Sequence, residues 1–215
     1  MRISELSRHS GVSTATIKYY TREHLLPEGD RTGYNQTEYG DDHVARLRLI
    51  RALIDTGGLS VADTQRVLAA IDDPALPLDS TLGVAQQAIP KSSTPPSDAS
   101  LARVREVIDE RGWQVYPNNP GITQAASVLD SYAHIGREDL GAALSGYAEA
   151  ADLIADVDLR LVADSGSRDR MAETVVVGTV LGDTLIAGLR RIAQENTSHH
   201  RFGAPPPPDP KEPRS

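Results

Sequence analysis

The stretch Ser13–Pro27, STATIKYYTREHLLP, decides the fold of the first part of the chain. Ser13 is a residue type that caps helix N-termini, and steps of about 100° per residue along the following helix separate two faces. The first face holds Ser13, Ile17, Tyr20 and His24, and the second holds Thr14, Lys18 and Arg22. We expect the first face to pack within the protein and the second to be free to touch a partner.

The neighbouring segments extend this helix into a small domain. A helix is predicted over Ile3–Ser10, and Gly11 separates it from the Ser13 helix, which gives the order helix, tight turn, helix. Pro27 ends the second helix, and turn residues between 28 and 39 divide two short stretches that could pair as strands. The pattern predicts a helix-turn-helix followed by a two-stranded wing.

Two more helices complete this unit. Asp41 and Asp42 suit a helix N-terminus, and the apolar stripe behind them ends at Gly57. Ser60–Asp63 is a capping-box pattern that opens a fourth helix through residue 71. These helices close a compact N-terminal unit.

Helical patterns also dominate the rest of the chain. A weak helix is predicted over 79–89, and helical stripes without strand alternation recur over 99–111, 122–135, 138–164 and 168–196. The chain is therefore predicted to be mainly α. The predicted units are a winged helix-turn-helix domain at 1–73, a linker with a short helix at 74–98, an all-helical domain at 99–200 and a disordered proline-rich tail at 201–215.

The composition excludes several classes of protein. The 215 residues include no cysteine, which rules out disulfides, thiolate metal sites and cysteine nucleophiles. No unbroken run of about 18 apolar residues predicts a membrane span, and the first residues carry neither an apolar signal core nor a cleavage site. We therefore expect a cytoplasmic, nucleoid-associated protein with no membrane partner.

The net charge of −8 is divided unevenly. Residues 1–71 carry nine basic and nine acidic side chains, whereas residues 72–215 carry thirteen basic and twenty-one acidic ones. A basic footprint is the usual signature of nucleic-acid binding. Any case for DNA must therefore rest on local motifs.

No constellation typical of an enzyme stands out. None of the six histidines forms the spaced pair with a glutamate that a zinc hydrolase requires, and no phosphate-binding glycine loop follows a predicted strand. The carboxylates of Asp152, Asp156, Asp158 and Asp164 are typical of a solvated helix face. We expect no catalytic residue, no cofactor and no metal site.

The Ser13 helix has the composition of a DNA-contacting helix. It concentrates hydroxyls, two phenols and two cations, which are groups that bind phosphate oxygens. A major groove about 12 Å wide admits one helix, so Thr14, Ala15 and Lys18 could approach base edges. Tyr19 and Arg22 would then hold the DNA backbone. Helix-turn-helix spacing alone is weak evidence, because any two packed helices joined by glycine produce it.

Short motifs add specificity because they follow one another in a fixed order. They are Ile3-Ser-Glu-Leu6, Gly11-Val-Ser13, Thr16-Ile-Lys-Tyr-Tyr20, Leu25-Leu-Pro27, Arg31-Thr-Gly-Tyr34, Tyr39, Leu47-Arg-Leu-Ile50 and Gly58-Leu-Ser-Val61. In this order and spacing they resemble the N-terminal domain of the MerR family of bacterial transcription regulators. The resemblance covers about a third of the chain.

The resemblance implies a DNA-binding site made of the second helix and the wing. The second helix would enter the major groove of double-stranded DNA, Arg31, Tyr34 and Asn35 would grip flanking phosphates, and Tyr39 would end the wing. Lys18 and Asn35 stand where relatives often carry arginine, which weakens bidentate phosphate contact. The expected DNA-binding residues are Ser13, Thr14, Thr16, Lys18, Tyr19, Tyr20, Arg22, Arg31, Tyr34, Asn35 and Tyr39.

Two departures from the family concern the rest of the chain. Family members dimerise through a long helix after the fourth, often holding a metal there through cysteines, but this chain has no cysteine and has prolines at 90, 95 and 96. The second domain must then supply most of a dimer contact. Gly178 and Gly182, one turn apart in a predicted helix, suggest a close backbone approach, either between subunits or within one chain.

The second domain could also bind an effector that is not a metal. Trp113, Tyr116, Tyr132 and Tyr147 could line a pocket, and Asp130 and Glu149 could attract a cation, although core packing and solvated surface are the more common roles. The favoured function is a sequence-specific regulator, acting as a homodimer on a palindromic promoter site with RNA polymerase as a further partner. The alternative is a helical protein–protein interaction module without specific DNA binding.

Overall fold

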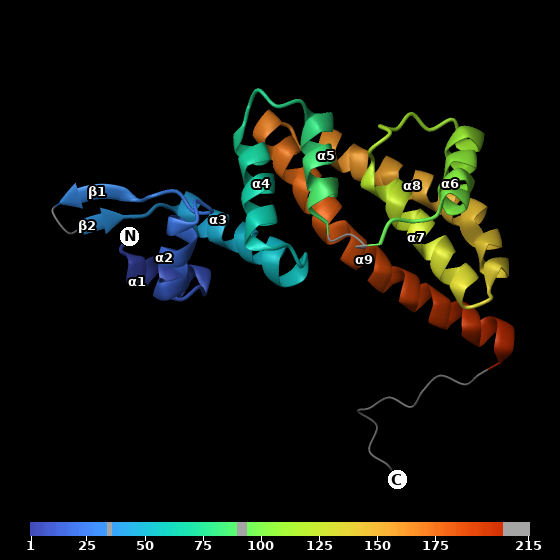
Figure 1. The fold of residues 1–215 in the computed structure, drawn as a ribbon. Coiled ribbons are helices and arrows are strands. Elements are labelled where there is room, and N and C mark those ends of the chain that lie inside the picture. The colour runs from blue at the N-terminus through green and yellow to red at the C-terminus, as the bar shows by residue number, and fades with distance from the viewer. Residues whose placement is uncertain (34–35, 90–93, 204–215) are drawn as a thin grey trace, which may run out of the picture.

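The computed structural model describes residues 1–33, 36–89 and 94–203. The elements in chain order are α1 (Ile3–Ser10), α2 (Thr14–Arg22), β1 (Asp30–Gly33), β2 (Gln36–Glu38), α3 (Asp41–Arg51), the π-helical segment η1 (Ala52–Thr56), α4 (Val61–Asp72), α5 (Leu78–Ala88), α6 (Asp98–Arg111), α7 (Pro120–His134), the 3-10 helix η2 (Glu138–Ala143), α8 (Leu144–Ala163) and α9 (Arg168–Phe202). They form an elongated molecule with the wing at one end and α6, α7 and α8 at the other (Figure 1). The predicted mainly α fold is confirmed. The predicted tail beyond residue 203 lies outside the described residues.

The first three helices pack around one apolar core. Gly11 joins α1 to α2 with a φ of 71°, a left-handed conformation that glycine adopts without steric cost. Ser13 caps α2, because its hydroxyl accepts a hydrogen bond from the Thr16 amide at 3.1 Å. Leu6 and Ile17 are fully buried between the helices. The predicted order of helix, tight turn and capped helix is therefore confirmed.

The wing is a two-stranded antiparallel sheet fastened to the chain's N-terminus. Arg31 on β1 pairs with Thr37 on β2. Immediately after β2, the carbonyl of Tyr39 accepts a hydrogen bond from the Met1 amino group at 2.8 Å, and the Tyr39 amide donates one to the Met1 carbonyl at 2.9 Å. These bonds hold the base of the wing beside α1.

The next helices follow their predicted caps but include one unpredicted feature. Ser60 caps α4 by accepting a hydrogen bond from the Asp63 amide at 3.0 Å, as the capping-box pattern predicts. The third helix runs from Asp41 as expected, but it widens from α3 into η1 over its last turn. Such π-helical segments depend on packing rather than on a residue pattern.

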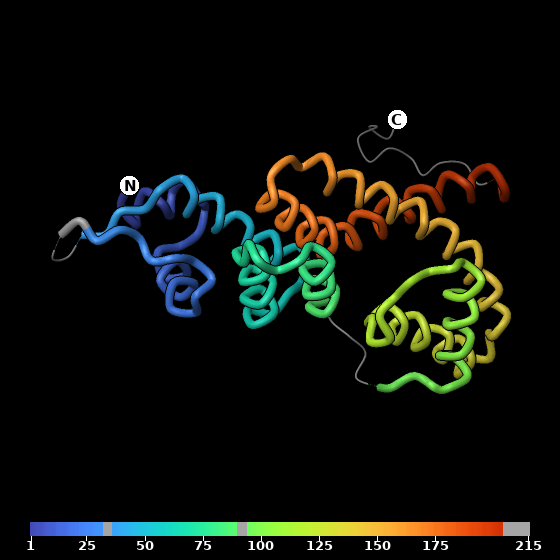
Figure 2. The backbone as a smooth tube through the Cα atoms, turned by 90° about the horizontal axis from the view of Figure 1, so that it is seen from above, coloured from blue at the N-terminus to red at the C-terminus, as the bar shows by residue number. Residues whose placement is uncertain are grey.

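The N-terminal half of α9 joins the core of the N-terminal unit. Val176 and Val180 are buried in the same apolar cluster as Leu53 of η1 and Val67 of α4. Gly57 lies against the Val180 side chain, where a Cβ atom would have no room. Two views show α9 running from the side of α4 and α5 to the far end of the molecule (Figures 1 and 2).

Helix α5 is held between α4 and α9. Its residues Ala85 and Ala88 are buried in the shared cluster, and the Arg168 guanidinium of α9 donates a hydrogen bond to the Leu76 carbonyl in the turn before α5. The sequence analysis assigns α5 to a linker and α9 to a separate domain. Those boundaries stay a prediction, but α5 and α9 share one packed core with the N-terminal unit.

The helices at the far end are fastened by two carboxylates. Asp130 accepts hydrogen bonds from the Ser97 amide and hydroxyl, both at 2.6 Å, and from the Ser100 hydroxyl at 2.7 Å. These bonds, led by that of the Ser97 hydroxyl, lower the pKa of Asp130. Asp152 of α8 likewise accepts hydrogen bonds from Trp113 and Arg111 near the end of α6. Asp130 and Trp113, considered above for ligand binding, instead join α6 to its neighbours.

Helix α9 is apolar over much of its length. Its most apolar 18 residues have a mean hydropathy of 1.4, which together with the helix length is enough for a membrane span, and 22 % of that window is buried in the chain. The window contains no unbroken apolar run of this length, because glycines, threonines and single acidic residues interrupt it, but its mean hydropathy still reaches this value. Length and composition alone are weak evidence for a span, since core helices reach the same values.

The contact between α9 and the N-terminal unit can be tested through Val176. We expect Val176→Ala to lower the free energy of unfolding by about 1–3 kcal/mol, because it removes two methyl groups from a fully buried site. Urea denaturation measures this change. Val128→Ala, at an exposed position of α7, is the control and should change stability by less than about 0.5 kcal/mol. Equal effects in the two variants would contradict the packing described.

Candidate nucleic-acid interface

Helix α2 presents a short exposed face on a buried base. Ile17 and Tyr20 point into the core, whereas Thr14, Ala15 and Lys18 are exposed. The predicted packing face is confirmed at Ile17 and Tyr20. Ser13 and His24, which are also predicted to pack, are instead exposed because they lie before and after α2. The exposed face carries a hydroxyl, a methyl group and an ammonium group, which are suited to base edges and phosphates in a major groove.

The first turn of α2 is held by its own hydroxyl groups. The Ser13 and Thr16 hydroxyls lie 2.8 Å apart, and Ser13 also accepts the Thr16 amide. Ser13 is exposed and Thr16 is half-buried. The structure thus gives both residues a capping role, and their contact with DNA stays a prediction.

Arg22 and Tyr19 form one exposed unit at the end of α2. The Arg22 guanidinium lies 5.3 Å from the centre of the Tyr19 ring, in cation–π geometry. It also approaches the Glu23 carboxylate at 3.4 Å. Because the ring orients the guanidinium while most of its surface stays exposed, Arg22 remains available to an anion.

Tyr20 is the predicted site residue that the structure places in the core. Only 8 % of its surface is exposed, and it belongs to the cluster around Leu6 and Ile17. Burial, followed by the nearby charge of Asp55, raises the pKa of its phenol. We therefore assign Tyr20 a packing role behind α2.

The wing carries one further exposed cation. Arg31 on β1 is exposed, and the half-buried Tyr39 packs its ring edge-to-face on His43, with centroids 5.2 Å apart. Tyr39 therefore supports the base of the wing. The other two predicted wing residues, Tyr34 and Asn35, lie outside the described residues.

Arg2 is a candidate that the sequence analysis misses. Its guanidinium donates a hydrogen bond to the Gln36 side chain on β2 at 2.9 Å, and the residue is exposed. It thus lies beside the wing although it is distant from the wing in sequence. The signal available in the sequence is a cation directly before the first helix.

Some cations of the N-terminal unit form ion pairs in the described structure and others do not. Within the N-terminal unit, several arginines are matched by acids of the same unit. These pairs are Arg46 with Asp72, Arg51 with Asp55, and Arg66 with Asp63. By contrast, Lys18 and Arg31 have no ion pair in the part of the chain that the structure describes. Lys18 and Arg31 therefore remain without an ion pair, but so do Arg2, Arg8 and Arg48 among the described residues, and the wing also carries Asp30 and Glu38 beside Arg31.

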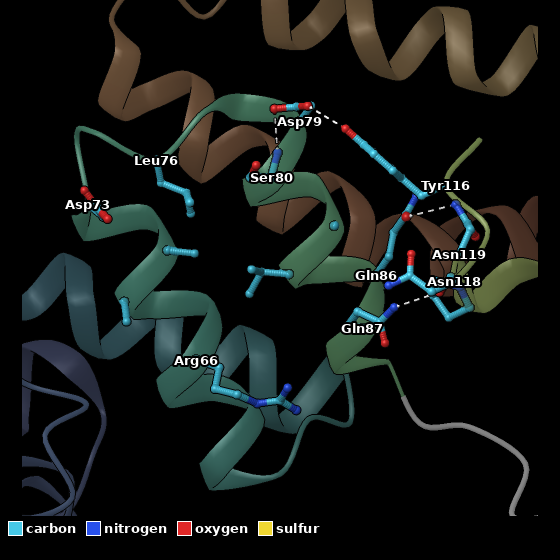
Figure 3. Close-up of a pocket in the computed structure, with 15 residues that line it drawn as sticks. Arg66, Asp73, Leu76, Asp79, Ser80, Gln86, Gln87, Tyr116, Asn118 and Asn119 are labelled. Carbon is cyan, nitrogen blue, oxygen red and sulfur yellow. Dashed lines mark hydrogen bonds between the residues drawn. The ribbon is translucent and has the colours of Figure 1, made fainter. Parts of the chain in front are cut away.

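A groove of about 720 Å³ lies between α4, α5 and the loop joining α6 to α7 (Figure 3). Tyr116 of this loop donates a hydrogen bond to Asp79 at 3.3 Å, and Gln87 donates one to the Asn118 carbonyl at 3.1 Å. These polar groups satisfy one another and fasten the loop to α5. Tyr147, another aromatic candidate, is exposed elsewhere, where its ring lies 5.6 Å from the Arg190 guanidinium.

The structure offers no cluster suited to a metal ion. Across residues 1–33, 36–89 and 94–203, no group of three or more His, Cys, Asp or Glu side chains could hold one.

The cap of α2 gives a direct test of how this surface is held. We expect Ser13→Ala to lower the free energy of unfolding by about 1 kcal/mol, because the Thr16 amide loses its acceptor. Ser13→Asp keeps an acceptor and should stay within about 0.5 kcal/mol of the original protein. Chemical denaturation of both variants measures the difference. A Ser13→Ala variant as stable as Ser13→Asp would show that the cap is dispensable.

Comparison with known proteins places this surface in a recognised domain. Residues 1–71 match the model of the MerR HTH family regulatory protein. The chain is 41 % identical over 69 residues to the HTH-type transcriptional regulator HmrR of Sinorhizobium medicae (strain WSM419), covering 32 % of this chain and 46 % of that protein. It is 34 % identical over 71 residues to the mercuric resistance operon regulatory protein of Bacillus cereus, covering 33 % and 53 %. The chain thus spans about half the length of these curated relatives.

One solved structure extends the comparison beyond the N-terminal unit. The crystal structure of SCO5550 from Streptomyces coelicolor A3(2), a protein assigned as a transcriptional regulator, is 32 % identical to this chain with a TM-score of 0.70. The match covers 96 % of this chain and all of the other. With the N-terminal match and the helix-turn-helix geometry, this shows that the chain belongs to the MerR family of helix-turn-helix regulatory proteins.

Proposed function

We propose that this protein is a sequence-specific, DNA-binding transcription regulator and not an enzyme. The observation that carries the proposal is the exposed face of α2, with Thr14, Ala15 and Lys18, together with the exposed Arg31 of the wing. The family membership of residues 1–71 supports it. Base contacts from α2 and phosphate contacts from the wing together would give both affinity and sequence preference.

Binding to promoter DNA separates this function from a protein-interaction role. We expect the full chain to shift DNA from the promoter of its own operon at low salt, and to bind it at least about tenfold more tightly than shuffled DNA of equal length. Equal affinity for both DNAs, or no binding, would favour the helical interaction module instead.

The cations on this surface should each account for part of the salt dependence. Lys18→Ala, Arg22→Ala and Arg31→Ala should each weaken DNA binding and lower the slope of log affinity against log salt by about 1, because each removes a phosphate contact. Fluorescence anisotropy over a salt series measures the slope.

Arg105→Ala is the matched control, because Arg105 is exposed on the distant helix α6. It should leave affinity and slope unchanged. Thr14→Ala should alter the ranking of operator sequences more than the salt slope, because a hydroxyl near base edges reads sequence. Unchanged slopes in all three cation variants would mean that the contact surface lies elsewhere.

The exposed stripe of α9 supports a homodimer. Leu185, Leu189 and Ile192 keep the i, i+4, i+7 spacing of a helix seam, and each is more than half exposed. Leu153 and Val157 of the neighbouring helix α8 are exposed as well. Soluble proteins rarely leave such contiguous apolar surface uncovered.

A second copy is the occupant that best explains this stripe. Symmetric pairing covers the same surface on both subunits and places two α2 helices at a fixed separation, as a palindromic site requires. We further propose that the dimer meets RNA polymerase at the promoter.

The role of this stripe in dimer formation can be tested by introducing one charged residue. We expect Leu189→Glu to shift the protein from dimer to monomer in sedimentation velocity, because it would bury a carboxylate in the interface. Affinity for the palindromic site should fall with it. Gln194→Glu adds the same charge at an exposed position of the same helix and should leave the dimer intact. A Leu189→Glu variant that stays dimeric would exclude this stripe as the interface.

A further inference from the structure

A second cavity, of about 350 Å³, lies among α5, α7, α8 and α9. Its walls are mainly apolar side chains from three of these helices. They include Leu82 of α5 and Ile89 directly after it, Ile154 and Val162 of α8, and Val175 and Ile186 of α9. This volume is at the lower end of the range for small-molecule sites in proteins.

Two glycines give the cavity its depth on the side of α9. Gly178 and Gly182 both line it, and a Cβ atom added at either would meet nothing within 4 Å. The close backbone approach within the chain, one of the two explanations left open for these glycines, is therefore absent. Glycine inside a helix costs about 1 kcal/mol relative to alanine. Here it leaves space for an occupant.

The charged groups of the cavity all have one sign. Asp158 of α8 and Asp183 of α9 line it, together with uncharged polar residues and no Lys, Arg or His. Neither carboxylate has an ion pair among the described residues. The hydroxyl groups of Thr174 and Thr179, in contrast, donate to carbonyls of their own helix. The two carboxylates are thus the charged groups of the cavity, and they have no positively charged partner among the described residues.

The surroundings of Asp183 disfavour a lone negative charge. Both Asp158 and Asp183 are exposed, but partial loss of water contact at the cavity wall, followed by the negative charge of Asp158, raises the pKa of Asp183. A positive group between the two carboxylates would relieve both effects.

We propose that this cavity is an effector site for an amphipathic organic cation, with Asp158 and Asp183 holding the positive group and the apolar walls holding the remainder. This inference rests on the proposed regulatory function. A bare metal ion fits less well, because two carboxylates among aliphatic side chains offer too few oxygen ligands and too much apolar surface.

The position of the cavity gives its occupant a route to the DNA-binding unit. Leu82 of α5 lines it, while Ala85 and Ala88 of the same helix pack in the core shared with α4. Val175 of α9 lines it one residue before the buried Val176. An occupant would therefore contact the two helices that pack on the N-terminal unit.

Three probes of similar shape and different charge test the site by titration calorimetry on the full chain. They are 4-phenylbutylammonium, 4-phenylbutan-1-ol and 4-phenylbutanoate. We expect the cation to bind one site per chain at least about tenfold more tightly than the alcohol, and the anion not to bind. Equal binding of the cation and the alcohol, or binding of none, would overturn the proposal.

Two sets of variants locate the binding. The double variant Asp158→Asn and Asp183→Asn should lose the preference for the cation. The control variant Asp156→Asn and Glu195→Gln makes the same change in net charge on exposed parts of α8 and α9. It should retain the preference for the cation. Gly178→Leu should fill the cavity and abolish binding while the melting temperature stays equal or rises. Retained binding in Gly178→Leu would place the probe elsewhere and overturn the proposal.

Two further measurements separate this inference from the others. The Asp158→Asn and Asp183→Asn double variant should bind operator DNA like the original chain when no probe is present, so loss of DNA binding bears on the proposed function alone. Gly178→Leu should remain dimeric in sedimentation. If it becomes monomeric, a second copy occupies the cavity, and the small-molecule site is wrong.

Discussion

The packing of α9 against η1 and α4 is the contact on which the rest of the molecule depends. Val176 and Val180 fill the space beside Leu53, and Gly57 allows the backbone of the N-terminal unit to come close. Without this contact, α6, α7 and α8 would be joined to the winged unit through α5, by the segment that follows it and by the hydrogen bonds of Asp79 and Gln87 to the loop before α7. With it, one helix connects the apolar core behind α2 to the far end of the molecule (Figure 2).

That arrangement gives successive parts of α9 different tasks. Its first turns are buried against the N-terminal unit, its glycines open into the cavity beside α8, and its later leucines are exposed. A helix 35 residues long can serve all three because its hydrogen bonds are internal and it stays rigid between them. Under the functions we propose, pairing of subunits and occupancy of the cavity would both act on the DNA-binding unit through the same helix.

Local signals were enough to predict most helices. The serine caps at Ser13 and Ser60 and the turn at Gly11 act within a few residues, so the sequence displays them directly. The sharing of one core by α5 and α9 could not be predicted, because Ala85 and Val176 meet only after the chain has folded back. Tyr20 shows the same limit at the candidate site. A phenol on α2 is compatible with DNA contact or with burial, and only the packing of Leu6 and Ile17 around it decides for burial.

The distribution of charge explains how an acidic chain can present a surface for DNA. Residues 1–71 are neutral in total, and several acids of the N-terminal unit lie beside arginines that stabilise the scaffold, such as Asp72 with Arg46 near the end of α4. Pairing within the scaffold partly neutralises those cations, whereas Lys18 and Arg31, which have no ion pair among the described residues, keep their local positive potential. Because exposed charges farther apart than about 10 Å are largely screened at physiological salt, the acidic helices at the far end weaken this local potential little. Net charge is therefore a poor guide to DNA binding in an elongated protein, and the pattern of pairing is a better one.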